Sequence, residues 1–127
     1  MVVRADDGAP AVIANAPFLD DGTPMPTRYW LVDPALREAV SRVESSGGVR
    51  LAEATVAAER VADAHARYGA ERDALIPADH AGPRPTGGVG GTRQGVKCLH
   101  AHLAWWLSGG DDPIGEWTAR QVGLHPS

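Results

Sequence analysis

A thiol and two imidazoles lie close together in the segment GVKCLHAHLAWWLSGGDDP, residues 95–113. On a regular helix, which turns about 100° per residue, Cys98 and His102 share one face and His100 points about 160° away from Cys98. A cysteine and a histidine four residues apart on a helix are typical of paired zinc ligands, so they predict a metal site with zinc as the candidate cofactor. The remaining ligands would come from other elements, with these candidates: Asp33, His65, Asp79 and His80.

The same side chains have two further interpretations. In a catalytic site, His100 or His102 would act as general acid or base, with Asp33 orienting the imidazole. In a structural interpretation, His100 is a hydrogen-bonded residue at the margin of the apolar stripe of its helix. Trp105 is expected on the less buried side of this helix, beside Cys98 and His102. The residues alone leave metal-binding, catalytic and structural roles open.

The segment GGVGGTRQGVK, residues 87–97, places glycines and cations at the start of the expected helix. Free backbone amides and the helix dipole at such a position favour an anion. The spacing departs from the phosphate-binding pattern G-x-x-x-x-G-K-[ST], and a flexible connector is the alternative interpretation. The first interpretation predicts a pocket for an anionic small molecule, with these ligand-binding residues: Thr92, Arg93, Lys97, Thr27, Tyr29 and Trp30.

The elements that must hold these residues are mostly helical. β-Branched and aromatic residues in AVIANAPFL and TRYWLV predict two antiparallel strands within a β element at about residues 11–32. Apolar spacing, Asp-Pro starts and glycine stops predict about four helices. The helices are expected at about residues 34–46, 50–76, 95–108 and 113–122, and a loop rich in glycine and proline at 77–95. The predicted fold class is therefore α+β, predominantly helical, in a single domain of residues 1–127.

The composition is that of a globular protein, with 43% hydrophobic and 22% charged residues in a chain of 127. A net charge of −4 argues against a nucleic-acid partner, and no apolar run is long enough to span a membrane. A single cysteine and an N-terminus without the features of a secretion signal favour a cytoplasmic location. The alternative function is a non-enzymatic interaction module, a homodimer in particular, that docks through the helical seam and Trp105.

Two blocks of the sequence resemble a known family. They are PAVI…APFLDDGTPMPTRYWLVDP within residues 10–34 and GGTRQGVKCLHAHLAWWLSGGDDPIG at residues 90–115. Both are similar to the bacterial family catalogued as domain of unknown function 501, and the likeness spans about residues 4–117. The resemblance implies an uncharacterised activity linked to cell division or envelope physiology.

The resemblance also implies extra cysteines, in an Arg-Cys-Pro-like opening and a Cys-Pro of many members. This chain has Ala5 and Asp33 at those positions. A cysteine-rich site is therefore not expected here, although Asp33 can replace a thiolate as a zinc ligand.

Overall fold

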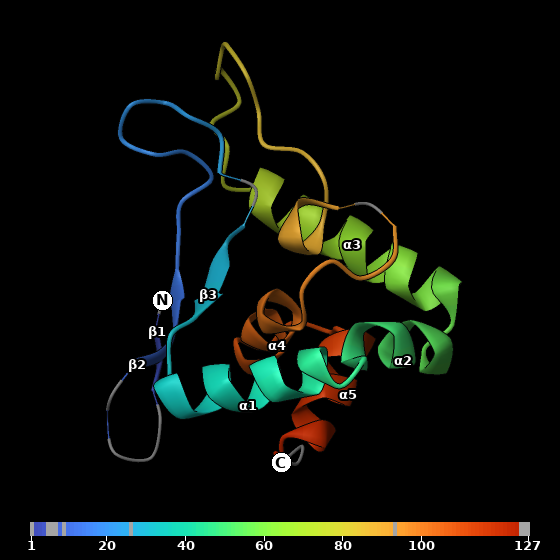
Figure 1. Ribbon diagram of the computed structural model, residues 1–127. Helices are drawn as coiled ribbons and strands as arrows, with labels where there is room; N and C mark the ends of the chain where they lie inside the picture. The colour runs from blue at the N-terminus through green and yellow to red at the C-terminus, as the bar shows by residue number, and fades with distance from the viewer. Residues whose placement is uncertain (1, 5–7, 9, 26, 93, 125–127) are drawn as a thin grey trace.

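The computed structural model describes residues 2–4, 8, 10–25, 27–92 and 94–124. Within these residues, five α-helices and a small antiparallel sheet form an α+β fold dominated by helices, which confirms the predicted fold class. The sheet lies at one end of the molecule, and the helices gather beside it around α4 (Figure 1). No helix of the described residues is both long and apolar enough to cross a membrane.

The sheet has three strands in the order β1-β2-β3: Val2–Arg4, Pro10–Ala14 and Tyr29–Leu31. The two predicted strands are β2 and β3, and β1 is a third strand, not predicted, because the first residues of the chain also pair with β2. In β3, Tyr29 and Leu31 are buried and Trp30 is exposed, which is the alternation of a half-buried strand. Ile13 pairs with Trp30 across the ladder, so these two side chains share the outer face of the sheet.

Helix α1, Pro34–Ser45, begins at the Asp-Pro pair as the sequence predicts. The Asp33 carboxylate caps it by accepting a hydrogen bond of 2.9 Å from the amide of Leu36. The helix expected at residues 50–76 is instead two helices, α2 at Gly48–Thr55 and α3 at Ala58–Asp73. Val56 is extended between them and buries its side chain, and its β-branched type lowers the cost of leaving the helix.

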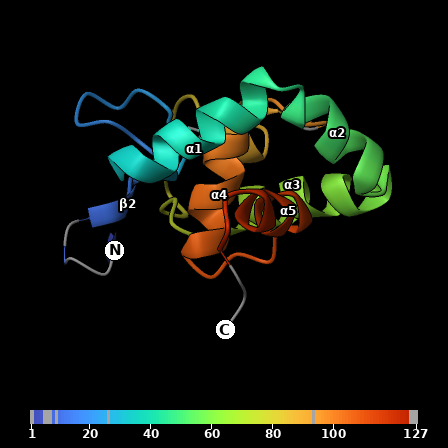
Figure 2. The same ribbon diagram turned by 60° about the horizontal axis from the view of Figure 1, so that its bottom comes forward.

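Helix α4, Leu99–Leu107, lies at the centre of the molecule and packs against α1, α5 and β3 (Figures 1 and 2). It begins at Leu99 rather than at residue 95, because Gly95 turns with φ +64° and Cys98 is extended with φ −152°. Helix α5, Pro113–Gln121, follows the second Asp-Pro pair. Gly115 lets α5 approach closely, since a Cβ atom there would lie 2.5 Å from the carbonyl oxygen of His102.

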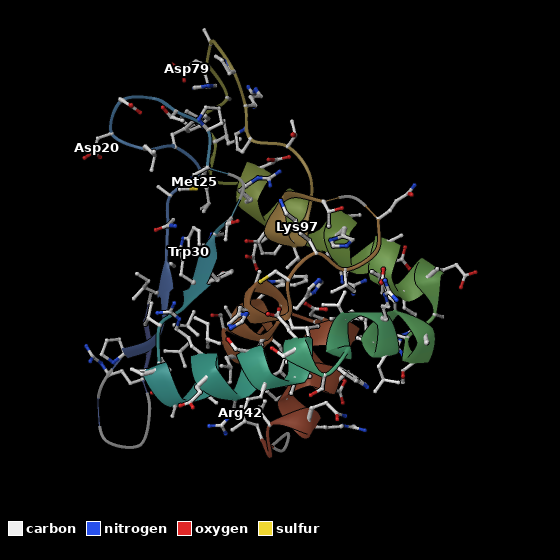
Figure 3. The ribbon with its side chains drawn as sticks, viewed as in Figure 1. Asp20, Met25, Trp30, Arg42, Asp79 and Lys97 are labelled. Atoms are coloured by element: carbon white, nitrogen blue, oxygen red, sulfur yellow. The ribbon has the colours of Figure 1, made fainter. Side chains whose placement is uncertain are left out.

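The two long loops lie on the same side of the molecule. Figure 3 shows Asp20 of the loop between β2 and β3 near Asp79 of the segment after α3. Phe18 and His80 connect the loops by stacking, with 4.3 Å between their ring centroids. A short 3-10 turn, Val89–Gly91, then leads back to α4. This return places the glycine-rich segment beside the N-terminal end of α4.

Candidate metal centre

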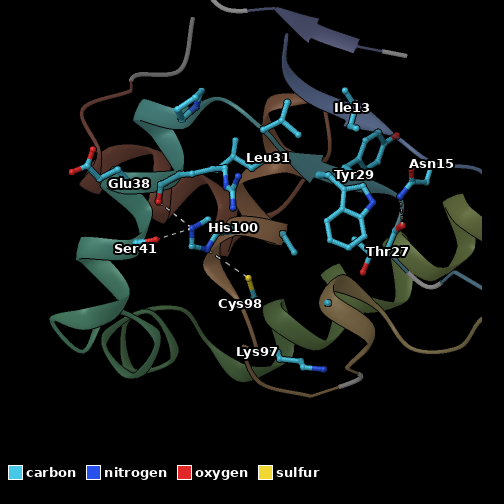
Figure 4. Close-up of a pocket in the computed structure, with 16 residues that line it drawn as sticks. Ile13, Asn15, Thr27, Tyr29, Leu31, Glu38, Ser41, Lys97, Cys98 and His100 are labelled. Carbon is cyan, nitrogen blue, oxygen red and sulfur yellow. Dashed lines mark hydrogen bonds between the residues drawn. The ribbon is translucent and has the colours of Figure 1, made fainter.

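An open pocket of about 960 Å³ lies between the sheet, α1 and the beginning of α4. Cys98 and His100 belong to its wall, and Figure 4 shows His100 between Ser41 and Cys98. Four of the residues predicted to bind a ligand also line it: Thr27, Tyr29, Trp30 and Lys97. The structure therefore brings the strand residues and the α4 residues together at one cavity.

Cys98 occupies the N-cap position of α4, and its side chain makes no capping hydrogen bond. Its sulfur lies 3.8 Å from Nδ1 of His100. The predicted pairing of Cys98 with His102 was wrong, because a rotation of 100° per residue applies only within a helix and Cys98 lies before its first residue. The thiol of Cys98 instead lies beside the imidazole of His100, two residues later.

The two nitrogens of His100 face different groups. Nε2 lies 3.1 Å from the backbone oxygen of Arg37 and 3.3 Å from the hydroxyl of Ser41. A carbonyl oxygen only accepts hydrogen bonds, so Nε2 carries the proton and donates a hydrogen bond to the backbone oxygen of Arg37. In the neutral ring, Nδ1 then presents a lone pair to Cys98. The same bond fixes the orientation of the imidazole, as carbonyl and carboxylate acceptors do for metal-ligating histidines.

Glu44 of α1 completes the cluster, and it is the residue that sequence reasoning missed. Its Oε1 lies 3.3 Å from Nδ1 of His100, and its Oε2 accepts a 2.8 Å hydrogen bond from the amide of Leu99. A signal was present in α1, because Arg37, Ser41 and Glu44 follow the four- and three-residue spacing of one helix face. That face is turned toward His100.

Two of the separations among the three candidate ligand atoms are close to those of a zinc site. Sulfur, Nδ1 and a carboxylate oxygen of Cys98, His100 and Glu44 all lie within 4.8 Å of one another, and all three residues are partly exposed. A tetrahedral zinc ion, with bonds of about 2.0–2.3 Å, sets neighbouring ligand atoms about 3.4–3.6 Å apart. The observed separations of 3.3 Å and 3.8 Å from Nδ1 need little adjustment.

His102 lies apart from this cluster, in the core. Its Nδ1 is 2.6 Å from Oδ2 of Asp112, and both side chains are fully buried. Its Nε2 is buried and has no hydrogen-bond partner among the described residues. The ring of His65 lies beside it, with 5.6 Å between ring centroids. The position of His102 fits a structural pair with Asp112 rather than a wall of the pocket.

His65 of α3 holds the glycine-rich segment against the core. Its Nδ1 accepts a hydrogen bond of 3.1 Å from the amide of Val89, and its Nε2 lies 2.7 Å from the carbonyl oxygen of Gly95. Both contacts are satisfied by a neutral ring that carries its proton on Nε2. Burial lowers the pKa of His65, and the Gly95 carbonyl opposes this effect.

Several predicted site residues have other surroundings. Asp33 caps α1, and Thr92 donates to the carbonyl of Gln94 at 2.9 Å, outside the pocket lining. The prediction for Arg93 lies outside the described residues. Tyr29 lines the pocket, but its hydroxyl donates to Glu71 at 2.9 Å. Burial and this carboxylate raise the pKa of Tyr29 to about 12.

The other candidate ligands and Trp105 also lie away from the cluster. His80 stacks on Phe18, and Asp79 is exposed on the distal loop. The expected exposure of Trp105 was wrong, because only 3% of this residue is accessible while Trp106 is half-buried. Helix α4 is enclosed on several sides, so its second face is covered as well as its apolar stripe.

Fold and site together define a small α+β protein with a mixed cysteine, histidine and glutamate cluster, of which Cys98 and His100 line a pocket. The model of the family described as Protein of unknown function (DUF501) matches residues 1–120 of the 127, so the chain belongs to this family. The resemblance found in the sequence is thereby confirmed. No curated protein and no solved structure matches the chain.

Proposed function

We propose that this protein binds a zinc ion through Glu44, Cys98 and His100 and presents it to the pocket. The carrying observation is that a thiol and a carboxylate approach the same nitrogen of His100. Nε2 donates to the carbonyl oxygen of Arg37, so Nδ1 of the neutral ring offers a lone pair. Electron-rich atoms of three side chains therefore converge. A cation among them balances this arrangement and uses all three as ligands.

A catalytic relay of the cysteine–histidine–acid type fits this geometry less well. In such a relay, the nucleophile and the acid bind opposite nitrogens of the imidazole, which passes a proton from one side to the other. Here Cys98 and Glu44 both face Nδ1, and the opposite nitrogen is bonded to Arg37 and Ser41. This difference favours metal coordination.

Three protein ligands leave the fourth position of a tetrahedral zinc ion for water or for an oxygen of a bound molecule. Zinc in such a position polarises an oxygen ligand and lowers the pKa of a bound water. Ligation also requires that Cys98 stay reduced, which agrees with the predicted cytoplasmic location. The proposed function is therefore a ligand-binding metal site with an open position.

The test is a titration of the metal-free protein with zinc, followed by cobalt substitution. We expect one ion per chain and, with cobalt, the near-ultraviolet charge-transfer absorption of a cobalt–thiolate bond. Cys98→Ser should abolish this absorption, and His100→Gln and Glu44→Gln should each weaken zinc binding at least about tenfold.

Matched controls are His80→Gln and Glu59→Gln, because these residues have the same side-chain types outside the cluster. Neither should change the zinc affinity or the cobalt spectrum. A wild-type protein that binds no zinc, or zinc binding that all three ligand variants retain, would overturn the proposal. A proton shared between His100 and Glu44 would then account for their approach.

A further inference from the structure

The pocket beside the proposed zinc site has an apolar wall on the outer face of the sheet. Ile13 and Trp30 are partners across the β2–β3 ladder, and 38% and 41% of these residues are accessible. Both line the pocket. Exposed aromatic and branched side chains next to polar groups are typical of sites that bind the apolar part of a small molecule. The sheet therefore supplies a flat surface for such a group.

Two of the three charged residues that line the pocket in the described part of the chain are basic. Arg37 and Lys97 line it, and neither forms an ion pair within the described part of the chain. Glu38, the acidic residue of the lining, is paired with Arg42 at 2.5 Å. A pocket with free cations and a neutralised carboxylate attracts an anion, although the whole chain carries a net charge of −4.

The two cations are placed differently. The backbone oxygen of Arg37 accepts a hydrogen bond from His100, so the backbone of Arg37 lies beside the proposed metal ligand, and Arg37 also lines the pocket. The side chain of Lys97 points away from His100 (Figure 4). An anionic head group near the metal would therefore depend more on Arg37 than on Lys97. A planar guanidinium also matches the two oxygens of a carboxylate or phosphonate.

We infer that the zinc-loaded pocket binds an organic acid, with its anionic head group between the metal and Arg37 and its apolar body on Trp30 and Ile13. This inference rests on the proposed function and names the class of its ligand. The pocket volume of about 960 Å³ is ample for a molecule of this kind. Zinc supplies the open coordination position, while the sheet and Arg37 supply selectivity.

The experiment measures binding of four probes to the zinc-loaded protein by isothermal titration calorimetry. Phenylphosphonate and benzoate carry both a ring and an anion, methylphosphonate lacks the ring, and benzyl alcohol lacks the charge. We expect the first two to bind at least about tenfold more tightly than the last two, because methylphosphonate loses the apolar contact with the sheet and benzyl alcohol loses the contact of the anion with the metal and Arg37. The ratio of phenylphosphonate to benzoate then identifies the preferred head group.

Variants locate the binding. Arg37→Gln and Trp30→Thr should each weaken phenylphosphonate binding at least about tenfold, since each removes one of the two interactions. Lys97→Gln should weaken it less, and Arg60→Gln, an exposed arginine outside the pocket lining, should leave it unchanged. Unchanged binding in both Arg37→Gln and Trp30→Thr, or equal affinity for all four probes, would overturn the inference.

Zinc binding is measured first, so the two proposals fail separately. Zinc binding without binding of any organic acid overturns this inference alone. Absence of zinc binding overturns the proposed function, and with it the head-group contact stated here. A second copy of the chain could also cover Trp30, and sedimentation tests this outcome. A dimer that Trp30→Thr converts to a monomer would overturn the inference.

Discussion

Three histidines surround the beginning and the middle of α4, and each uses its ring nitrogens differently. His100 donates from Nε2 and leaves Nδ1 facing a thiol and a carboxylate. His65 has both nitrogens bonded to the backbone of the glycine-rich segment. His102 pairs with Asp112 in the core. Of these three histidines, His100 is therefore the one whose surroundings suit a metal ion.

The burial of His65 makes the stability of the metal-free protein depend on pH. Burial lowers the pKa of His65 in the folded protein below its unfolded value of about 6.5. As the pH falls below about 6.5, the unfolded chain binds more protons, so the free energy of unfolding decreases. A single group contributes at most about 1.4 kcal/mol per pH unit to this slope. At higher pH, the contribution of a neutral His65 is fully present.

Urea unfolding between about pH 5 and pH 8, in the presence of a chelator, measures how the free energy of unfolding depends on pH. His65→Gln should be less stable than the wild type at high pH and should show a flatter slope below about pH 6.5. His80→Gln removes a partly exposed imidazole and should keep the wild-type slope. Equal slopes in the wild type and in His65→Gln would contradict the role assigned to His65.

At the scale of the elements, two Asp-Pro pairs begin helices, but their aspartates make different numbers of contacts. Asp33 caps α1 through the amide of Leu36, and Asp112 caps α5 through the amide of Ile114 at 3.0 Å. Asp112 also holds the buried ring of His102, so it joins α5 to α4. The same dipeptide is therefore a local cap in one place and a connection between two helices in the other.

Alanine substitutions distinguish the contributions of the two aspartates to the free energy of unfolding. Asp33→Ala should lower the free energy of unfolding by about 1 kcal/mol, the usual cost of a lost cap. Asp112→Ala should lower it by about 3–5 kcal/mol, because it also leaves His102 buried without its partner. Asp111→Ala changes the exposed neighbour and should have little effect. Urea denaturation of the three variants measures the difference, and similar losses for Asp33→Ala and Asp112→Ala would refute it.

The elements that could be predicted from the sequence are those with strong local signals. Asp33-Pro34 and Asp112-Pro113 combine a capping carboxylate with a residue suited to the first helical turn, and both begin helices. The break after Thr55 has neither glycine nor proline, so the apolar spacing on both sides of it suggested one continuous helix. Tertiary packing of Val56 decides the conformation there.

The site was predictable only in part for a related reason. The sequence pattern placed Thr27, Trp30 and Lys97 at a predicted ligand site, and these residues line the same pocket as Cys98. It could not determine where α4 begins, and a start four residues later than expected moved Cys98 from the face of His102 to the side of His100. Glu44 is more than fifty residues away in the chain, so only the packing of α1 on α4 reveals it.

At the scale of the whole molecule, the segment that leads into α4 is fixed from several directions. Arg72, which interrupts the apolar seam of α3, is buried and donates to the carbonyl of Gly87 at 2.9 Å. His65 binds Val89 and Gly95, and Glu44 binds the amide of Leu99. Contacts from α3 and α1 thus position the backbone on which Cys98 and His100 lie.

Zinc should therefore stabilise the entire fold and not only its own ligands. Glu44 belongs to α1 and Cys98 to the segment before α4, so a bound ion links two elements that are distant in the chain. A ligand that binds only the folded state adds about 2.7 kcal/mol to the free energy of unfolding at a concentration of about one hundred times its dissociation constant. We expect a gain of this size in urea denaturation with zinc, its loss in Glu44→Gln, and its retention in Glu59→Gln. Equal stability with zinc and with chelator, under conditions where the titration shows a bound ion, would mean that the ion does not link α1 to α4.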